Sequence, residues 1–424
     1  MTVCLGQRGR VVGQLYSEAR GQRESAAFAY DQLWLNNQDR FELEPSLPLV
    51  SGPQFTARRP DGSIFPSVIA DTEPDGWAQK VIIRDHKKRR ARARSTGTSV
   101  PPPVLTSLDF LLAVDDMSRI GALRFRDEDG LFQRATERGR RTAPPTIELP
   151  RLLASSRAIE TGDETEEDLR YLRGRGTSVG GLRPKCTVID ELGRLAVAKF
   201  PSVKDTIPVA AGEVLALRLA RLAGINAAHA TLVNSDGAKV ALIRRFDRTA
   251  AGGRIPYASA ATLLGQESRG TEHTYCGLVD IMRQKGADTK TDIEELWRRI
   301  AFSILITNTD DHLRNHGFLH AEGGLWRLSP AFDINPTAGR VRELKTPLSE
   351  DAGPEATVEG LMSLVTHFRI PLARARVVLG EVEVAVAQWQ HEGRRLDMTD
   401  DDLDAFTEAF EHEERVEARR EASR

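Results

Sequence analysis

The sequence predicts an α+β fold with more than one domain. Short apolar runs of strand length lie near the N-terminus and between residues 195 and 243, whereas from about residue 258 the apolar residues recur at helical spacing. A length of 424 residues is enough for two or three domains and a large buried core. We divide the chain into segments 1–135, 136–245 and 246–424.

The bulk composition is that of an ordinary soluble protein. Hydrophobic residues make up 40% of the chain, charged residues 28%, and the formal net charge is −2, so overall charge gives no reason to expect a polyanion partner. Cys4, Cys186 and Cys276 are far apart and form no CxxC pair, which fits a reducing cytoplasm and disfavours disulfides or a zinc site. We expect a cytoplasmic protein, because the chain has neither a signal-peptide core nor an apolar run of roughly 20 residues.

The first segment combines short apolar runs with turn residues. Residues 11–15 favour a strand. The basic run from Arg84 to Arg94 leads into three prolines at 101–103, and we interpret it as a solvated surface loop or insertion. A patch that contacts polyphosphate or RNA is the alternative, weakened because no aromatic side chains are interleaved to stack on bases. Residues 161–175 look like a connector.

The middle segment predicts a strand, a helix and two further strands. The apolar run at residues 195–200 ends at Pro201, which favours a strand. Residues 215–223 place leucines on one helical face, and Gly224 suits the position after the last turn. Two strands joined by a Ser-Asp-Gly turn are expected within residues 230–243.

The apolar pattern of the last segment predicts helices. The clearest helix carries an apolar stripe from Ile293 to Leu305, with Thr291 and Glu294 as a candidate capping box. This helix would deliver Asp310 just after its C-terminal end. The charged tail from Asp400 to Arg424 has few apolar anchors, and we expect it to end in a fraying helix.

A polar cluster follows that helix. Asp310 is followed five residues later by Asn315, and Asp333 lies beyond, which is the order in which kinases place a catalytic carboxylate and two Mg²⁺ ligands. Such a cluster beside an apolar helix is costly unless it binds something, although a polar turn satisfied by its own side chains is the structural alternative. His312 fits a role in holding the loop together better than one in proton transfer.

Two lysines upstream fit the same chemistry. The turn from Ser178 to Lys185 contains adjacent glycines, which let backbone N–H groups approach phosphates, although a Gly-Gly turn alone is a weak signal. Lys199 ends a strand-like run and resembles the strand lysine of protein kinases, and Glu213 in the next helix could fix its direction. A strand-end lysine reaching water and a glutamate favoured by a helix N-terminus are the plain alternatives.

Several segments, taken in order, resemble the HipA family, the serine/threonine-kinase toxins of bacterial toxin–antitoxin modules. Strong matches are residues 177–185, 308–315 and 328–334, and residues 243–248 match the family's segment between its nucleotide-binding and helical lobes. Looser matches, to the family's N-terminal subdomain, are residues 107–112 and 119–123. Two features depart from the family: the stretch from Arg84 to Pro103 has no counterpart, and Arg244 stands where an acidic hinge residue is expected.

The resemblance implies a two-lobed protein-kinase-like fold with an N-terminal α/β subdomain (1–135), an ATP-binding lobe (136–245) and an all-helical C-terminal lobe (246–424). It implies catalysis by Asp310, Mg²⁺ on Asn315 and Asp333, and autophosphorylation of Ser178, which would switch the enzyme off by placing negative charge where ATP phosphates bind. Glu213 would support Lys199. The implied ATP-binding residues are Val179, Gly180, Gly181, Arg183, Lys185, Lys199, Arg244, Phe246 and His312.

The resemblance also implies partners. These are a helix-turn-helix antitoxin of the HipB type, through which operator DNA is contacted indirectly, and a protein substrate that is an aminoacyl-tRNA synthetase or another translation factor. No membrane partner is expected.

Three other functions remain open from the residues alone. A small-molecule phosphotransferase would use the same ATP machinery. A metal-dependent phosphohydrolase would gather Asp310, Asp311, His312 and Asp333 around two metal ions. A DNA-associated scaffold would use the basic stretch and bind DNA in a salt-dependent way.

Overall fold

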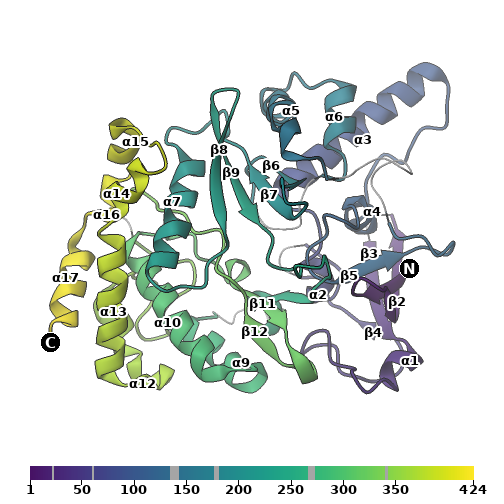
Figure 1. Ribbon diagram of the computed structural model, residues 1–424. Helices are drawn as coiled ribbons and strands as arrows, with labels where there is room; N and C mark the ends of the chain where they lie inside the picture. The colour runs from purple at the N-terminus through teal and green to yellow at the C-terminus, as the bar shows by residue number, and fades with distance from the viewer. Residues whose placement is uncertain (22, 60–61, 134–142, 176–180, 266–272, 340–341) are drawn as a thin grey trace. The chain divides into compact units, whose positions relative to one another are not determined.

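The computed structural model describes the chain from residue 1 to 424, apart from residues 22, 60–61, 134–142, 176–180, 266–272 and 340–341 (Figure 1). Its internal contacts divide the chain into two units. The first comprises Met1–Lys204, Asn234–Ala238 and Asp247–Ala258, and the second Asp205–Val233, Lys239–Phe246 and Ser259–Arg424. The domain boundaries expected at residues 135 and 245 stay a prediction.

The first unit contains a five-stranded sheet in the order β4-β3-β2-β1-β5. The strand expected at residues 11–15 is confirmed as part of β2, and β1 pairs antiparallel with both β2 and the distant β5. Val3, Phe28 and Phe125 are fully or almost fully buried on this sheet. Its strands are β1 (Thr2–Leu5), β2 (Arg10–Arg20), β3 (Arg23–Tyr30), β4 (Gln54–Phe55) and β5 (Leu123–Arg126).

The basic run is a helix, so the prediction of a surface loop was wrong. It forms the second half of α3 (Gly76–Thr96), which Asp75 caps by accepting a hydrogen bond from Ala78 N at 2.7 Å and which ends at the left-handed Gly97. Arginine and lysine are good helix formers. The error arose because the residues that cap the helix lie outside the basic run itself.

The basic face of α3 is paired with an acidic segment of the same unit. Arg84 forms an ion pair with Glu164, Arg92 forms one with Glu166 at 3.4 Å, and Lys88 donates to the Glu164 carbonyl. Residues 161–175 are therefore more than the expected connector, because they contain α6 (Glu166–Leu172), which packs against α3 and α5 (Leu149–Thr161) (Figure 1).

The strand expected at residues 195–200 is confirmed as β7 (Leu195–Lys199), which pairs antiparallel with β6 (Lys185–Ile189). Lys185 lies opposite Lys199 in this register. The remaining helices of the first unit are α1 (Gln32–Leu35), α2 (Ser67–Ala70), α4 (Ser107–Ala113) and the 3-10 turn η1 (Thr146–Glu148).

The helix predicted at residues 215–223 and the hairpin predicted within residues 230–243 are confirmed. α7 (Val209–Leu222) is followed by Gly224, which has a φ of +78° that suits glycine. β8 (Ala230–Ser235) and β9 (Ala238–Arg244) flank Asp236 and Gly237. Both of these residues have positive φ, as in the type of turn that joins the strands of two-residue hairpins.

The second unit is built around α10 (Thr289–Leu305). Leu296, Trp297 and Ile300 are completely buried, which confirms the predicted stripe. The predicted capping box was wrong, because the cap is Asp288, whose side chain accepts from Thr291 N at 3.4 Å. Helices α9 and α13 pack against α10 (Figure 1). The other helices here are α8 (Ala260–Leu263), α9 (Tyr275–Lys285), α11 (Val358–Ser363), α12 (Val365–Phe368), α13 (Leu372–Val386), α14 (Trp389–Arg394), α15 (Asp400–Asp404), α16 (Thr407–Phe410) and α17 (Glu413–Ala422).

The expected all-helical C-terminal lobe also contains strands. β11 (Gly317–His320) and β12 (Trp326–Leu328) form an antiparallel hairpin around the 3-10 turn η3 (Glu322–Gly324), and β10 (Tyr257–Ser259) lies earlier in the chain. Strands of three or four residues are too short to show a clear sequence period, which explains the error.

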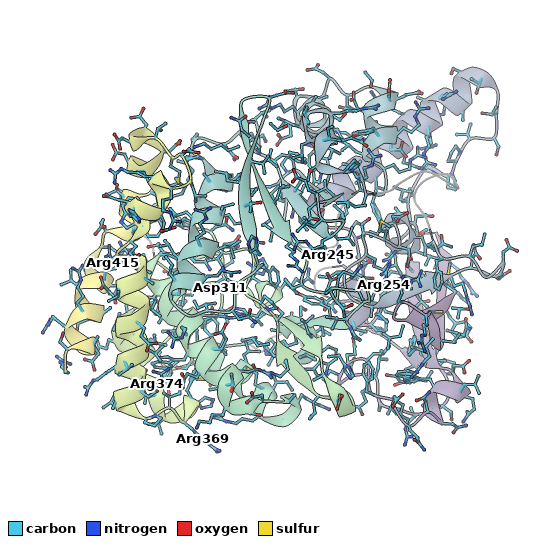
Figure 2. The ribbon with its side chains drawn as sticks, in the orientation of Figure 1. Arg245, Arg254, Asp311, Arg369, Arg374 and Arg415 are labelled. Atoms are coloured by element: carbon cyan, nitrogen blue, oxygen red, sulfur yellow. The ribbon has the colours of Figure 1, made fainter. Side chains whose placement is uncertain are left out.

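The C-terminal tail is docked, so the expectation of a fraying helix was wrong. Phe410 is fully buried and stacks on Trp389 with ring centroids 4.8 Å apart. α17 packs along α13, where the buried Arg415 pairs with Glu383 at 3.1 Å (Figures 1 and 2). Among the described residues, no helix combines the length and apolar character that a membrane span requires.

Candidate active site

The loop that carries Asp310 begins with an unusual backbone conformation. Just past α10, Thr307 has a φ of +52°, which is strained for a β-branched residue. Its hydroxyl donates to Ala409 O at 3.0 Å, and its carbonyl accepts from Thr337 N at 3.2 Å. The docked tail and the segment after Asp333 therefore hold the sharp turn that redirects the chain from α10 into this loop.

Asp310 lies on the loop just after α10, as predicted, and presents its carboxylate at the surface of the second unit. Its side chain is 62% exposed, and Lys345 Nζ lies 2.6 Å from its Oδ1. Its backbone carbonyl accepts hydrogen bonds from His312 N at 2.9 Å and from Asn315 Nδ2 at 3.1 Å. The carboxylate is thus held on a tightly bonded turn while remaining accessible.

The neighbouring Asp311 is buried in the second unit, at the position labelled in Figure 2. Its Oδ2 accepts from the hydroxyls of Tyr275 at 2.5 Å and Ser303 at 3.1 Å, and its Oδ1 lies 3.1 Å from His316 Nε2. Burial alone would raise the pKa of Asp311, but the neighbouring imidazole and the hydroxyl donors hold this pKa below its ordinary value. Asp311 is therefore a buried carboxylate that anchors the loop.

The predicted magnesium ligands fit the ion by their chemistry. Asn315 ends the 3-10 turn η2 (Leu313–Asn315), and its amide nitrogen donates to Asp310 O within the loop at 3.1 Å. Asp333 has a φ of +55°, and its Oδ1 accepts from Asn335 Nδ2 at 3.3 Å. Both offer the hard oxygen donors that Mg²⁺ prefers.

A further hydrogen bond links the two ligand segments within the second unit. Asn308 is buried and its Oδ1 accepts from Asn335 N at 3.1 Å, which joins the start of the catalytic loop to the segment after Asp333. Within the described ranges, no group of three or more histidine, cysteine, aspartate or glutamate side chains could hold a metal.

Two residues of the predicted adenine segment lie at the end of β9. Arg244 is exposed, and its backbone N–H donates to His229 O at 2.8 Å. The ring of Phe246 contacts that of Phe332 with centroids 5.3 Å apart. Phe246 therefore packs against the residue immediately before Asp333.

The described part of the predicted phosphate loop belongs to the first unit. Gly181 has a φ of +103°, and an added Cβ there would lie 2.9 Å from Lys185 Nζ, so this position requires glycine. Lys185 is buried and pairs at 3.1 Å with Asp75, the cap of α3. Arg183 is exposed. Ser178, Val179 and Gly180 lie outside the described residues.

The predicted lysine and glutamate pair lies in different units. Lys199 is half-buried at the end of β7 in the first unit, and Glu213 is buried in α7 in the second. Their interaction stays a prediction, as do the nucleotide contacts assigned to Lys199, Arg183, Lys185 and His312.

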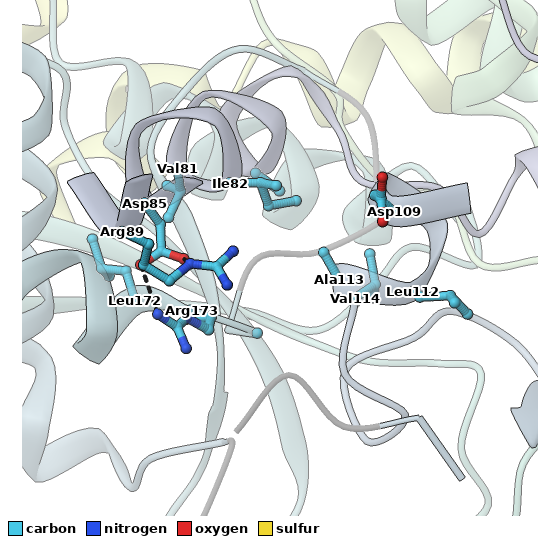
Figure 3. A pocket seen from close by; sticks show the side chains of 12 residues that line it. Val81, Ile82, Asp85, Arg89, Asp109, Leu112, Ala113, Val114, Leu172 and Arg173 are labelled. Atoms are coloured by element: carbon cyan, nitrogen blue, oxygen red, sulfur yellow. Dashed lines mark hydrogen bonds and ion pairs between the residues drawn. The ribbon is translucent and has the colours of Figure 1, made fainter. Parts of the chain in front are cut away.

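A pocket of about 260 Å³ in the first unit contains none of the predicted site residues (Figure 3). Its apolar wall includes Val81 and Leu112, and its charged side is formed by Asp85, which pairs with Arg89 at 3.0 Å and with Arg173 at 2.7 Å. The Asp85 carboxylate is thus paired with two guanidinium groups of its own unit.

Sequence reasoning missed the groups that support Asp310. The sequence analysis gives Asp311 a role only in the phosphohydrolase alternative, and it does not single out Tyr275 or Lys345. No local sequence period marks Lys345, because the backbone bends at Lys345 and Thr346.

Family models match most of the chain. Residues 177–389 match the HipA-like C-terminal domain, which is half of the chain, and residues 2–97 match the HipA N-terminal domain. The chain belongs to the HipA family. The predicted family and enzyme class are thus confirmed: the chain is a serine/threonine protein kinase, and a kinase uses ATP.

Relatives of this HipA-family chain include two proteins of Sinorhizobium fredii. "Putative kinase Y4mE" is 24% identical over 78% of this chain and 76% of its own length. "Putative kinase Y4dM" is 26% identical over 73% of this chain and 71% of its own length.

A solved structure shares the fold over the whole chain. HipA of Shewanella oneidensis, determined in a complex with HipB and its operator DNA, matches with a TM-score of 0.66 at 15% identity, covering 100% of this chain and 96% of that one. The expected α+β class is confirmed by this likeness, while the finer division into lobes stays a prediction.

Proposed function

We propose that this chain is a Mg-ATP-dependent serine/threonine protein kinase that acts as the toxin of a toxin–antitoxin module. Asp310 orients the acceptor hydroxyl and receives its proton, and Lys199 contacts the phosphates of ATP. The observation that carries the proposal is the contrast between adjacent aspartates: Asp311 is buried and engaged by hydroxyl donors, whereas Asp310 is 62% exposed on the turn that Asp311 anchors.

Asn315 and Asp333 would hold Mg²⁺, and the bound ion would neutralise charge on the phosphates. This chain's own contribution is to keep those two oxygens in fixed places. The hydrogen bonds from Asn315 Nδ2 to Asp310 O and from Asn335 N to Asn308 Oδ1 support that assignment.

The remaining nucleotide contacts follow the family pattern. In this proposal the backbone at Arg244 and Phe246 receives the adenine, Glu213 directs Lys199, and His312 lies beside the nucleotide. Autophosphorylation of Ser178 adds about −1.5 to −2 charges at the phosphate-binding loop and switches the kinase off. The loop contacts themselves come from Val179, Gly180, Gly181, Arg183 and Lys185.

The proposed partners are a HipB-type helix-turn-helix antitoxin and a translation-related substrate, an aminoacyl-tRNA synthetase or another translation factor. The complex of the Shewanella protein with HipB and operator DNA supports the antitoxin assignment. DNA contact is indirect in this proposal. The pairing of Arg84 and Arg92 with Glu164 and Glu166 supports it, because it leaves less of the basic charge of α3 for phosphates.

Expression in a bacterial host tests the toxin role. The wild-type chain should arrest growth, Asp310→Ala should not, and co-expression of a helix-turn-helix protein encoded beside it should restore growth. Equal growth with wild type and Asp310→Ala would contradict the proposal. Transfer of phosphate to a metabolite, with none to protein, would favour the small-molecule phosphotransferase instead.

A further inference from the structure

Residues 342–348 of the second unit form an arm after Asp333. Leu344, Thr346 and Leu348 are buried, whereas Glu343 and Lys345 between them are exposed. The backbone bends at Lys345, Thr346 and Leu348, and the buried side chains of Leu344 and Thr346 hold the arm on the core on either side of Lys345. The backbone position of Lys345 is therefore fixed by its two buried neighbours.

Backbone and side-chain hydrogen bonds fasten this arm on both sides of Asp310. Lys345 N donates to Thr309 O at 3.1 Å, and Thr346 Oγ1 donates to Asp311 O at 2.8 Å. Consecutive residues of the arm thus hold the residues before and after Asp310. This arrangement gives Lys345 a defined place beside Asp310.

The resulting ion pair between Lys345 and Asp310 contributes little to stability. Lys345 Nζ lies 2.6 Å from Asp310 Oδ1, with the two side chains 61% and 62% exposed. An ion pair this exposed contributes about 0–1 kcal/mol. The pair is therefore easily broken, and its ammonium group lies directly beside the proposed catalytic carboxylate.

We propose that Lys345 is a further catalytic residue, whose ammonium group binds the phosphoryl group during its transfer. The inference deepens the proposed kinase function and rests on it. Before nucleotide binds, Lys345 neutralises Asp310; when the phosphates arrive, their negative charge attracts the ammonium group and frees the Asp310 oxygen for the acceptor hydroxyl.

The step balances without any further reactant. The acceptor oxygen forms a bond to the γ-phosphorus of ATP, and the bond from that phosphorus to the bridging oxygen breaks, so that ADP leaves with the electron pair. The hydroxyl proton passes to Asp310. Lys345 keeps its proton throughout and neutralises charge on the non-bridging oxygens, where a fixed cation is most effective.

The test compares Lys345→Ala, Lys345→Met and Lys345→Arg with Lys290→Ala, a matched change at an exposed lysine of α10. At saturating ATP, in Mg²⁺, the first two variants should transfer phosphate to protein about 100-fold more slowly than wild type, with the KM for ATP changed by less than about threefold. Lys345→Arg should recover most of the rate, because it restores the cation.

A second readout does not depend on turnover. ADP with aluminium fluoride mimics the phosphoryl group in transfer, so Lys345→Met should weaken binding of that pair by a similar factor while leaving binding of ADP alone unchanged. Melting temperatures of all variants should stay close to wild type, since the side chain is exposed and the backbone bonds of the arm remain.

Different failures point to different errors. Full activity in Lys345→Ala and Lys345→Met, with Asp310→Ala inactive, would overturn the role of Lys345 alone. A loss confined to KM, or an equal loss of ADP binding, would also overturn it. Full activity in Asp310→Ala, or no protein phosphorylation by wild type, would overturn the proposed function itself.

Discussion

The Tyr275 hydroxyl lies 2.5 Å from Oδ2 of Asp311, which joins the first residue of α9 to the residue after Asp310. Both side chains are buried, and Ser303 of α10 donates to the same oxygen. The loop is therefore fastened to two helices from behind, while Asp310 faces solvent.

Tyr275→Phe should lower the free energy of unfolding by about 1–3 kcal/mol, because it removes a hydroxyl that a buried carboxylate needs and leaves the ring in place. Urea unfolding measures the change. Tyr16→Phe, at a tyrosine that is 52% exposed, is the control and should change stability by less than about 0.5 kcal/mol. Equal effects of the two substitutions would contradict the anchoring role.

Asp310→Asn and Asp311→Asn should separate catalysis from stability. Asp310→Asn should abolish phosphotransfer. Its free energy of unfolding should stay within about 0.5 kcal/mol of the wild-type value, because the carboxylate is exposed. Asp311→Asn should lower the free energy of unfolding by about 1–3 kcal/mol, because the amide group of asparagine cannot reproduce the contacts of the buried carboxylate. Rates and urea curves for both variants test this, and the reverse assignment of effects would show that the aspartates have exchanged roles.

Lys185→Met should destabilise the chain by about 3 kcal/mol, since it leaves the buried Asp75 carboxylate without this partner. The double variant with Asp75→Asn should recover more than about 1 kcal/mol, because asparagine keeps the capping function and removes the charge. Thermal or urea unfolding of the single and double variants measures the coupling. If the two are equally stable, the ion pair contributes nothing.

Acidification should lower the free energy of unfolding, because His412 is partly buried. Burial lowers the pKa of His412 to about 4, whereas an unfolded histidine titrates near 6.5. Between about pH 6.5 and 4 the unfolded state therefore binds the extra proton, so stability falls as the pH falls through this window and this group adds no further change below it. His320, with a pKa also lowered by burial to about 4, contributes in the same direction.

His412→Gln should flatten that dependence. Unfolding free energies measured from pH 7.5 to 4 should fall less steeply in this variant than in wild type, while His391→Gln, at an exposed residue of α14, should not alter the slope. Because His412 Nε2 lies 3.1 Å from Leu305 O at the end of α10, loss of activity on acidification should accompany the loss of stability. An unchanged slope in His412→Gln would contradict this assignment.

The sequence predicted the elements that have a long period or a clear turn. The stripe of α10 and the Asp-Gly turn of the β8–β9 hairpin are local signals, and the position of Asp310 after α10 follows from them. The spacing of Asp310, Asn315 and Asp333 gave the candidate site because kinase chemistry needs those groups in that order.

Features that depend on distant partners could not be predicted in this way. The basic half of α3 was predicted to be a loop because its partner Glu164 lies far along the chain. The tail was predicted to end in a fraying helix because Glu383, which pairs with Arg415, belongs to α13. Lys345 was missed for the same reason, since its backbone contact with Thr309 is made in the folded state alone.

Incubation with γ-labelled ATP and Mg²⁺, followed by mapping of the labelled residue, tests the central claim most directly. The account predicts label on Ser178 in the wild-type chain and none in Asp310→Ala. Equal labelling of both proteins, or the absence of label from the wild type together with release of free phosphate, would contradict it.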